Sequence, residues 1–136
     1  MIKAIWGGTL MKTRVLCVDD QYGIRLLLKE ILKSDYDVMA VETGEEAIEN
    51  MRIFDPQVVI LDMKLQKMKG TELLEAIRQI KCNIHTIMMT GYQDCDVLGE
   101  IKRYNPEKII MKPFDVEQII SSVNELINNN YKVLVS

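Results

Sequence analysis

Short apolar runs alternate with amphipathic helical patterns along almost the whole chain, and this alternation limits the possible folds more than any other feature of the sequence. The runs are continuously apolar and rich in β-branched residues, which is typical of strands buried on both faces. We expect five strands, over residues 14–18, 36–41, 57–61, 84–89 and 108–111. Helical spacing predicts five helices, over about 24–32, 43–54, 70–80, 94–103 and 115–127. The predicted fold is therefore α/β, a doubly wound parallel sheet with helices on both faces.

Polar side chains stand where four of these five runs end. Asp19 and Asp20 follow the first run, and Asp62 follows the third. Thr90 follows the fourth run, and Lys112 follows the fifth. Because right-handed crossovers bring the carboxyl ends of parallel strands to one edge of the sheet, we expect these side chains to lie close together there. Ligand sites of open α/β sheets lie at the same edge.

Three carboxylates, a hydroxyl and an ammonium group at one edge indicate a site for a small oxyanion. Converging carboxylates repel one another, and a hard divalent cation with oxygen ligands, such as Mg²⁺, relieves that repulsion. Lys112 adds a positive charge suited to a phosphoryl group. The chemistry that fits is phosphoryl transfer onto Asp62, which gives an acyl phosphate. Asp19 and Asp20 taken alone would equally suit a helix N-terminus, so the combination of strand ends carries the prediction.

The residues around these strand ends resemble the receiver domains of two-component and phosphorelay signalling, over about residues 13–128. The matching segments are Val18-Asp19-Asp20, Leu61-Asp62-Met63-Lys64, Met89-Thr90-Gly91 and Lys112-Pro113-Phe114. The resemblance implies a response regulator with the flavodoxin-like (βα)5 fold and the strand order 2-1-3-4-5.

The resemblance also implies the role of each residue at the acidic edge. Asp62 would be phosphorylated. Asp20 and Asp62 would bind Mg²⁺ (or Mn²⁺) through their carboxylates, Asp19 would act mainly through water, and Lys64 would supply its backbone carbonyl. The cofactor expected for this chain is therefore a divalent cation.

Two further side chains would act on the phosphoryl group by the same resemblance. Thr90 would donate a hydrogen bond to a phosphoryl oxygen, and Lys112 would pair with the phosphoryl group. Pro113 would follow Lys112 through a cis peptide bond. The catalytic contribution would be limited to phosphorylation and dephosphorylation of the chain's own Asp62, with no free metabolite as substrate.

The segment 65–70 departs from the pattern of the family. It lacks the usual proline, and Lys69 stands where Asp or Asn commonly precedes the glycine, here Gly70. Because this loop lies beside Asp62, its lysines are expected to attract anions or to change the choice of partner.

A docking surface for partners is implied beside the phosphorylated edge. Its residues would be Gln21, Gly23, Ile24, Arg25, Leu27, Tyr92, Pro113 and Phe114. The partners implied are a sensor histidine kinase and a histidine phosphotransferase, which present helical hairpins, and a response-regulator phosphatase. Leu26 lies about 170° from the inward stripe of its helix, so it either packs against the last helix or belongs to this surface.

Residues 19–25 resemble, more narrowly, stand-alone receivers that pass phosphoryl groups along the relay that starts sporulation. The leading hypothesis is thus a phosphorelay intermediate, which accepts a phosphoryl group on Asp62 and passes it to a phosphotransferase histidine. The alternative is a chemotaxis-type receiver, in which phosphorylation switches the binding of a target protein. A flavodoxin-like cofactor protein is remote, because a phosphate loop rich in Ser, Thr and Gly does not follow the first strand.

Composition limits the remaining classes of function. With 17 Lys and Arg against 20 Asp and Glu, the net charge of −3 disfavours direct binding to nucleic acid. No apolar run is long enough to span a bilayer, and the three cysteines indicate neither a disulfide framework nor a zinc site, so we expect a cytoplasmic monomer without a membrane partner. We expect an extension over residues 1–10, a receiver over 11–128 and a tail over 129–136, with the output supplied by another protein.

Overall fold

The computed structural model describes residues 4–6, 9–91 and 95–135, with side chains for 11–91 and 97–128. Its centre is a five-stranded sheet in which every neighbouring pair is parallel. The strands are β3 (Thr13–Val18), β4 (Tyr36–Val41), β5 (Val58–Asp62), β6 (His85–Gly91) and β7 (Lys108–Lys112). They lie in the order β4-β3-β5-β6-β7, which is the predicted order 2-1-3-4-5 counted from β3. The predicted fold class is confirmed.

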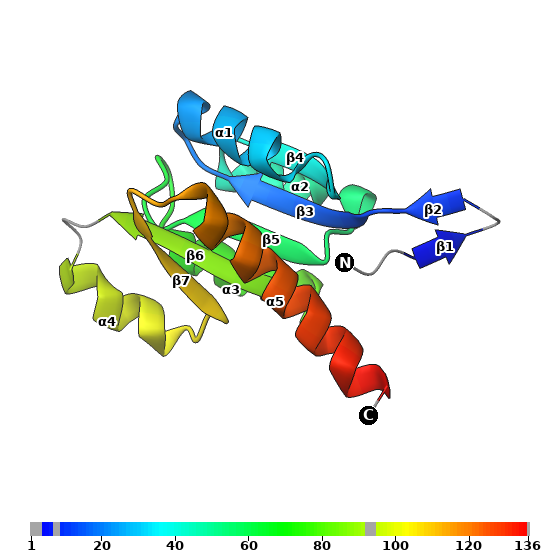
Figure 1. Cartoon of the computed structure of the whole chain (residues 1–136). Helices are drawn as coiled ribbons and strands as arrows, with labels where there is room; N and C mark the ends of the chain where they lie inside the picture. Colours follow the sequence, from blue (N-terminus) through cyan, green and yellow to red (C-terminus); the bar gives the residue numbers. More distant parts are fainter. Residues whose placement is uncertain (1–3, 7–8, 92–94, 136) are drawn as a thin grey trace.

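Five helices cover the two faces of this sheet (Figure 1). They are α1 (Tyr22–Leu32), α2 (Gly44–Phe54), α3 (Gly70–Ile80), α4 (Cys95–Arg103) and α5 (Val116–Val135). Helices α1 and α5 lie on one face, and α2 and α3 lie on the other. None of the helices in the described ranges is long and apolar enough to cross a bilayer.

Each face of the sheet packs into its own apolar core because side chains alternate along a strand. On β3, Val15 and Cys17 point to the face of α1 and α5, where Leu28 packs. Leu16 and Val18 point to the face of α2 and α3. All five side chains are fully buried, so the strands read as continuous apolar runs rather than as alternating ones.

Side chains cap the starts of α2 and α5, at residues that the sequence marks as helix caps. The Thr43 hydroxyl accepts a hydrogen bond from the Glu46 amide (3.1 Å) at the start of α2. At the start of α5, Asp115 Oδ1 accepts from the Gln118 amide (2.9 Å) while Gln118 Oε1 accepts from the Asp115 amide (3.1 Å). These bonds satisfy amide groups that have no partner within the helix.

Regular secondary structure continues into both ends of the chain. Strands β1 (Ala4–Trp6) and β2 (Thr9–Met11) form an antiparallel hairpin within the predicted extension, and the hairpin projects past the start of β3 (Figure 1). The last helix continues to Val135, through most of the predicted tail. No glycine or proline follows Asn128 to end it.

Helix α3 starts in close contact with the end of β5. The Gly70 amide donates a hydrogen bond to the Met63 carbonyl (2.7 Å). A Cβ atom on Gly70 would lie 2.3 Å from the Asp62 carbonyl oxygen and 2.7 Å from the Met63 Cα, which are backbone atoms that cannot turn aside. Gly70 therefore allows α3 to pack against the strand end that carries Asp62.

Gly70→Ala is expected to destabilise the protein by about 1–3 kcal/mol, because the backbone at Asp62 must shift to admit the methyl group. The matched control is Gly99→Ala in α4, where a Cβ would meet nothing within 4 Å and alanine should stabilise the helix by about 0.5–1 kcal/mol. Urea unfolding of both variants measures the difference. Equal effects would show that the contact at Gly70 does not constrain the strand end.

Candidate functional site

The parallel strands bring the predicted polar residues to one edge of the sheet. Asp19 directly follows β3, Asp62 is the last residue of β5, and Lys112 is the last residue of β7. Thr90 lies in β6, one residue before the strand ends. Register places them side by side, since Asp62 pairs with Met89 and Gly91 pairs with Lys112. The sequence located this cluster correctly.

Three carboxylates converge at this edge. Asp19, Asp20 and Asp62 each place one oxygen within 4.8 Å of the oxygens of the other two. Asp19 is fully buried, Asp62 is buried and Asp20 is half-buried. Asp19 is held in position, because its Oδ1 accepts a hydrogen bond from the Gln21 amide (2.9 Å).

Lys112 is paired with two of the three carboxylates. Its Nζ lies 2.8 Å from Asp19 Oδ2 and 3.3 Å from Asp62 Oδ2. Burial favours the neutral amine, but the hydrogen bond to Asp19 and the charge of Asp62 outweigh it, so the pKa of Lys112 is raised above its usual value. The ammonium group therefore remains charged at the centre of the site.

Burial raises the pKa of Asp62 to about 6. The nearby Lys112 ammonium opposes this effect, while the charges of Asp19 and Asp20 add to it. Desolvation and like charges therefore both disfavour the anion of Asp62.

The donor atoms of this cluster suit a hard divalent cation. Three carboxylates face one ammonium group, so the edge keeps an excess of negative charge in a partly desolvated place. Carboxylate oxygens are the ligands that Mg²⁺ accepts, completed by waters and backbone carbonyls. Lys64 follows β5 by two residues, and its backbone forms an isolated bridge with Lys69, so its carbonyl belongs to the loop beside Asp62.

Thr90 carries a polar group without a partner. Its side chain is buried, and its Oγ1 has no hydrogen-bond partner among the residues that the structure describes. Thr71 on α3 is buried in the same condition, a feature that nothing in the sequence indicated. A buried hydroxyl without a partner is costly, which is typical of sites where a ligand supplies the missing bond.

A groove opens beside the acidic edge, with a volume of about 470 Å³. It is lined by Gln21, Ile24, Leu27, Gly91, Lys112, Pro113 and Phe114. Five of the eight predicted docking residues therefore line a single groove that reaches Lys112. The peptide bond between Lys112 and Pro113 is cis, as the resemblance implied.

The other predicted docking residues lie elsewhere. Gly23 is exposed on α1 outside the groove. Arg25 donates a hydrogen bond to the Asp19 carbonyl (2.9 Å) and stacks over the Tyr22 ring. Tyr92 lies outside the described residues. Leu26 and Leu27 on α1 are both exposed, at 50% and 41%, and only Leu27 lines the groove.

The loop 64–69, which departs from the family pattern, is joined to α4. Lys69 Nζ lies 3.3 Å from Glu100 Oε1, and both residues line a pocket of about 520 Å³ with Met68 and Val97. No pattern in the sequence indicates this ion pair, because the two residues are 31 positions apart and belong to different elements.

A protein-family model described as Response regulator receiver domain matches residues 15–124. The chain belongs to this family. The acidic cluster, the lysine at the end of β7 and the groove thus lie on a receiver domain.

The chain is similar to two receivers of Bacillus subtilis, one named for sporulation and one for chemotaxis. Sporulation initiation phosphotransferase F of Bacillus subtilis (strain 168) is 37% identical over 117 residues, which are 85% of this chain and 94% of the relative. Chemotaxis protein CheY of the same organism is 28% identical over 120 residues, 87% of this chain and 100% of the relative.

Solved structures share the fold. A CheY-like response regulator receiver domain protein from Methanospirillum hungatei JF-1 superimposes with a TM-score of 0.82 at 28% identity, covering 89% of this chain and 98% of that one. The signal receiver domain of a putative Luxo repressor protein from Vibrio parahaemolyticus has a TM-score of 0.80 at 30% identity, covering 93% and 98%.

Asp62→Asn is expected to stabilise the metal-free receiver by about 1–3 kcal/mol at pH 7.5. The raised pKa of about 6 means that the folded state holds this proton more tightly than the unfolded chain, so stability is lost as pH rises from about 4 through 6. The gain in free energy of unfolding should fall to about half of this value at pH 5. Urea unfolding in EDTA at both pH values measures it, with the exposed Asp35→Asn as control. A gain that is absent or independent of pH would contradict the buried charge as its cause.

Proposed function

We propose that this receiver is a cytoplasmic phosphorelay intermediate, which accepts a phosphoryl group from a histidine kinase on Asp62 and passes it to a histidine phosphotransferase. One observation carries the proposal: Asp62 pairs with Lys112 (3.3 Å), and Lys112 in turn lines a mostly apolar groove. The 37% sequence identity with Sporulation initiation phosphotransferase F supports a role in sporulation initiation.

The arrangement suits an in-line transfer between nitrogen and oxygen. A carboxylate oxygen of Asp62 forms the new bond to phosphorus while the bond to the kinase histidine breaks, and the electron pair returns to the imidazole. Lys112 lies close enough to Asp62 to pair with the transferred oxygens, and the unpartnered Thr90 hydroxyl donates to one of them. Transfer to the phosphotransferase histidine reverses these changes.

Asp20 and Asp62, with Asp19 through water and the Lys64 carbonyl, would hold Mg²⁺ (or Mn²⁺). When bound, the ion supplies positive charge to the phosphoryl oxygens. Asp19 keeps Lys112 oriented through their 2.8 Å contact, and the Gln21 amide fixes Asp19 in turn.

We assign the docking of a partner protein to the groove between α1 and the residues that follow β7. Ile24, Leu27 and Phe114 supply its apolar surface, and Lys112 joins it to the phosphorylation site. Such a groove fits a helix of a kinase, a phosphotransferase or a response-regulator phosphatase. The chemotaxis-type switch is the second candidate, supported by full-length similarity to Chemotaxis protein CheY.

Asp62→Asn should abolish phosphorylation by acetyl phosphate in the presence of Mg²⁺, because the amide oxygen is too weak a nucleophile to accept the phosphoryl group. Intact-mass spectrometry should show one added phosphoryl group on the wild-type chain and on the Asp35→Asn control. Undiminished phosphorylation of the variant would assign the acceptor to another residue.

Leu27→Asp should slow phosphoryl exchange with a histidine phosphotransferase by about tenfold or more, because it places a charge in the apolar groove. Leu26→Asp is the matched control, since the neighbouring leucine is similarly exposed but lies outside the groove. Both variants should still react with acetyl phosphate. The rate of exchange is measured as the transfer of radiolabelled phosphoryl groups from Asp62 to the phosphotransferase. If the wild-type chain transfers no label at all, the chemotaxis-type switch is supported instead.

A further inference from the structure

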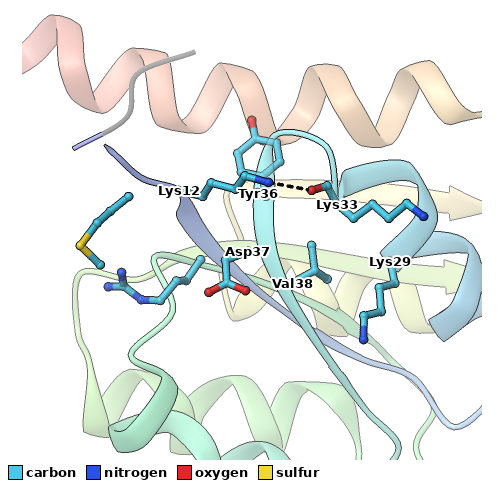
Figure 2. Close-up of a pocket in the computed structure, with 8 residues that line it drawn as sticks. Lys12, Lys29, Lys33, Tyr36, Asp37 and Val38 are labelled. Atoms are coloured by element: carbon cyan, nitrogen blue, oxygen red, sulfur yellow. Dashed lines mark hydrogen bonds between the residues drawn. The ribbon is translucent and has the colours of Figure 1, made fainter. Parts of the chain in front are cut away.

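A second groove lies at the opposite end of the sheet from Asp62, where β3 and β4 begin. Its volume is about 490 Å³, and it is lined by Met11, Lys12, Arg14, Lys29, Lys33, Tyr36, Asp37 and Val38. Figure 2 shows these side chains around β4, with Lys29 extending from α1 and Lys33 directly following that helix. Neither the family resemblance nor the proposed relay uses these residues.

The groove is basic in a chain that is acidic overall. It gathers four cationic side chains and one carboxylate, Asp37, whereas the whole chain carries a net charge of −3. Lys12 donates to the Lys33 carbonyl (3.2 Å), and neither Lys12 nor Lys29 has an ion pair with any carboxylate in the described part of the chain. The local charge therefore attracts an anionic partner.

The remaining two cations already have carboxylate partners. Arg14 lies 3.5 Å from a carboxylate oxygen of Asp55, which it shares with Lys81 at 2.9 Å. Lys33 lies 2.8 Å from Glu30 in an exposed pair on the same helix. Arg14 is the more firmly held of the two, because its Nε also donates a hydrogen bond to the Asp55 carbonyl (2.9 Å). The exposed pair of Lys33 contributes little, so Lys33 remains available to another anion.

One wall of the groove is the edge of the sheet. Strand β4 is the outermost strand and pairs only with β3 in the described sheet. Three consecutive residues of β4, Tyr36, Asp37 and Val38, line the groove. An outer strand presents unpaired backbone N–H and C=O groups, which are a template for one more strand.

We propose that this groove binds an extended acidic segment of a partner protein, which adds as a strand along β4 and sets its carboxylates against Lys12, Lys29 and Lys33. The edge strand supplies backbone hydrogen bonds, and Val38 and Met11 supply apolar contact. A compact polyanion fits less well, because Asp37 stands among the cations. An extended segment alternates its side chains and places an uncharged one opposite Asp37.

Occupancy of this groove leaves the phosphorylation site free. Strand β3 separates the two places: Arg14 is near its start, and Asp19 follows its end. Its six residues span about 20 Å. The acidic segment and a kinase or phosphotransferase are therefore able to bind at the same time.

The test uses the full-length chain labelled with ¹⁵N and a capped peptide of alternating glutamate and valine. We expect saturable binding that shifts the amides of residues 36–38 and weakens with added salt. Lys29→Glu combined with Lys33→Glu should weaken binding by about tenfold or more. The matched control is Lys102→Glu with Arg103→Glu, which reverses two exposed charges in the last turn of α4.

Two further probes separate strand addition from simple attraction of charge. A peptide with proline in place of valine keeps the carboxylates but lacks the N–H groups needed for pairing, so it should bind at least about tenfold more weakly. Inorganic tripolyphosphate should bind more weakly as well.

Equal binding of either probe, the absence of saturable binding, or equal loss in the control variant would overturn the proposal. Phosphorylation of Asp62 by acetyl phosphate should be unchanged in the α1 variant, so failure here is distinguishable from failure of the relay.

Discussion

The shared direction of five buried strands is the constraint on which the rest of this receiver depends. Because all five strands are parallel, their carboxyl ends lie at the same edge of the sheet. The side chains at the ends of β3, β5 and β7 therefore meet there, whatever their charges. Apolar packing of both faces holds the strands in register, so the repulsion between Asp19 and Asp62 cannot be relieved by moving them apart. The core therefore maintains a local arrangement that electrostatics alone would disperse.

That arrangement explains why one lysine matters to several functions of the site. Lys112 pairs with two carboxylates of the cluster, Asp19 and Asp62, and it also lines the groove beside them. A partner that enters the groove thus reaches the charge balance at Asp62 directly. Burial raises the pKa of Asp62 although the Lys112 ammonium opposes this effect. Stability has been given up locally to keep a reactive carboxylate.

Much of this was predictable because the signals are local or periodic. The strand order, the acidic edge and the capping residues Thr43 and Asp115 follow from hydrophobic runs and short motifs. Helical periodicity alone does not give the exposure of Leu26 and Leu27, because it marks an apolar arc but not how much of that arc the sheet covers; the structure leaves both residues exposed. The ion pair between Lys69 and Glu100 depends on how a loop meets a distant helix, which spacing in the sequence cannot report.

The buried hydroxyl of Thr90 has a kinetic consequence. A side chain that already donates a hydrogen bond must break it before turning to a new acceptor, and that step adds to the barrier. Thr90 Oγ1 has no such bond within the described structure. In the proposed relay, donation by Thr90 to an oxyanion at Asp62 would therefore require rotation about a single bond and no loss of an earlier hydrogen bond.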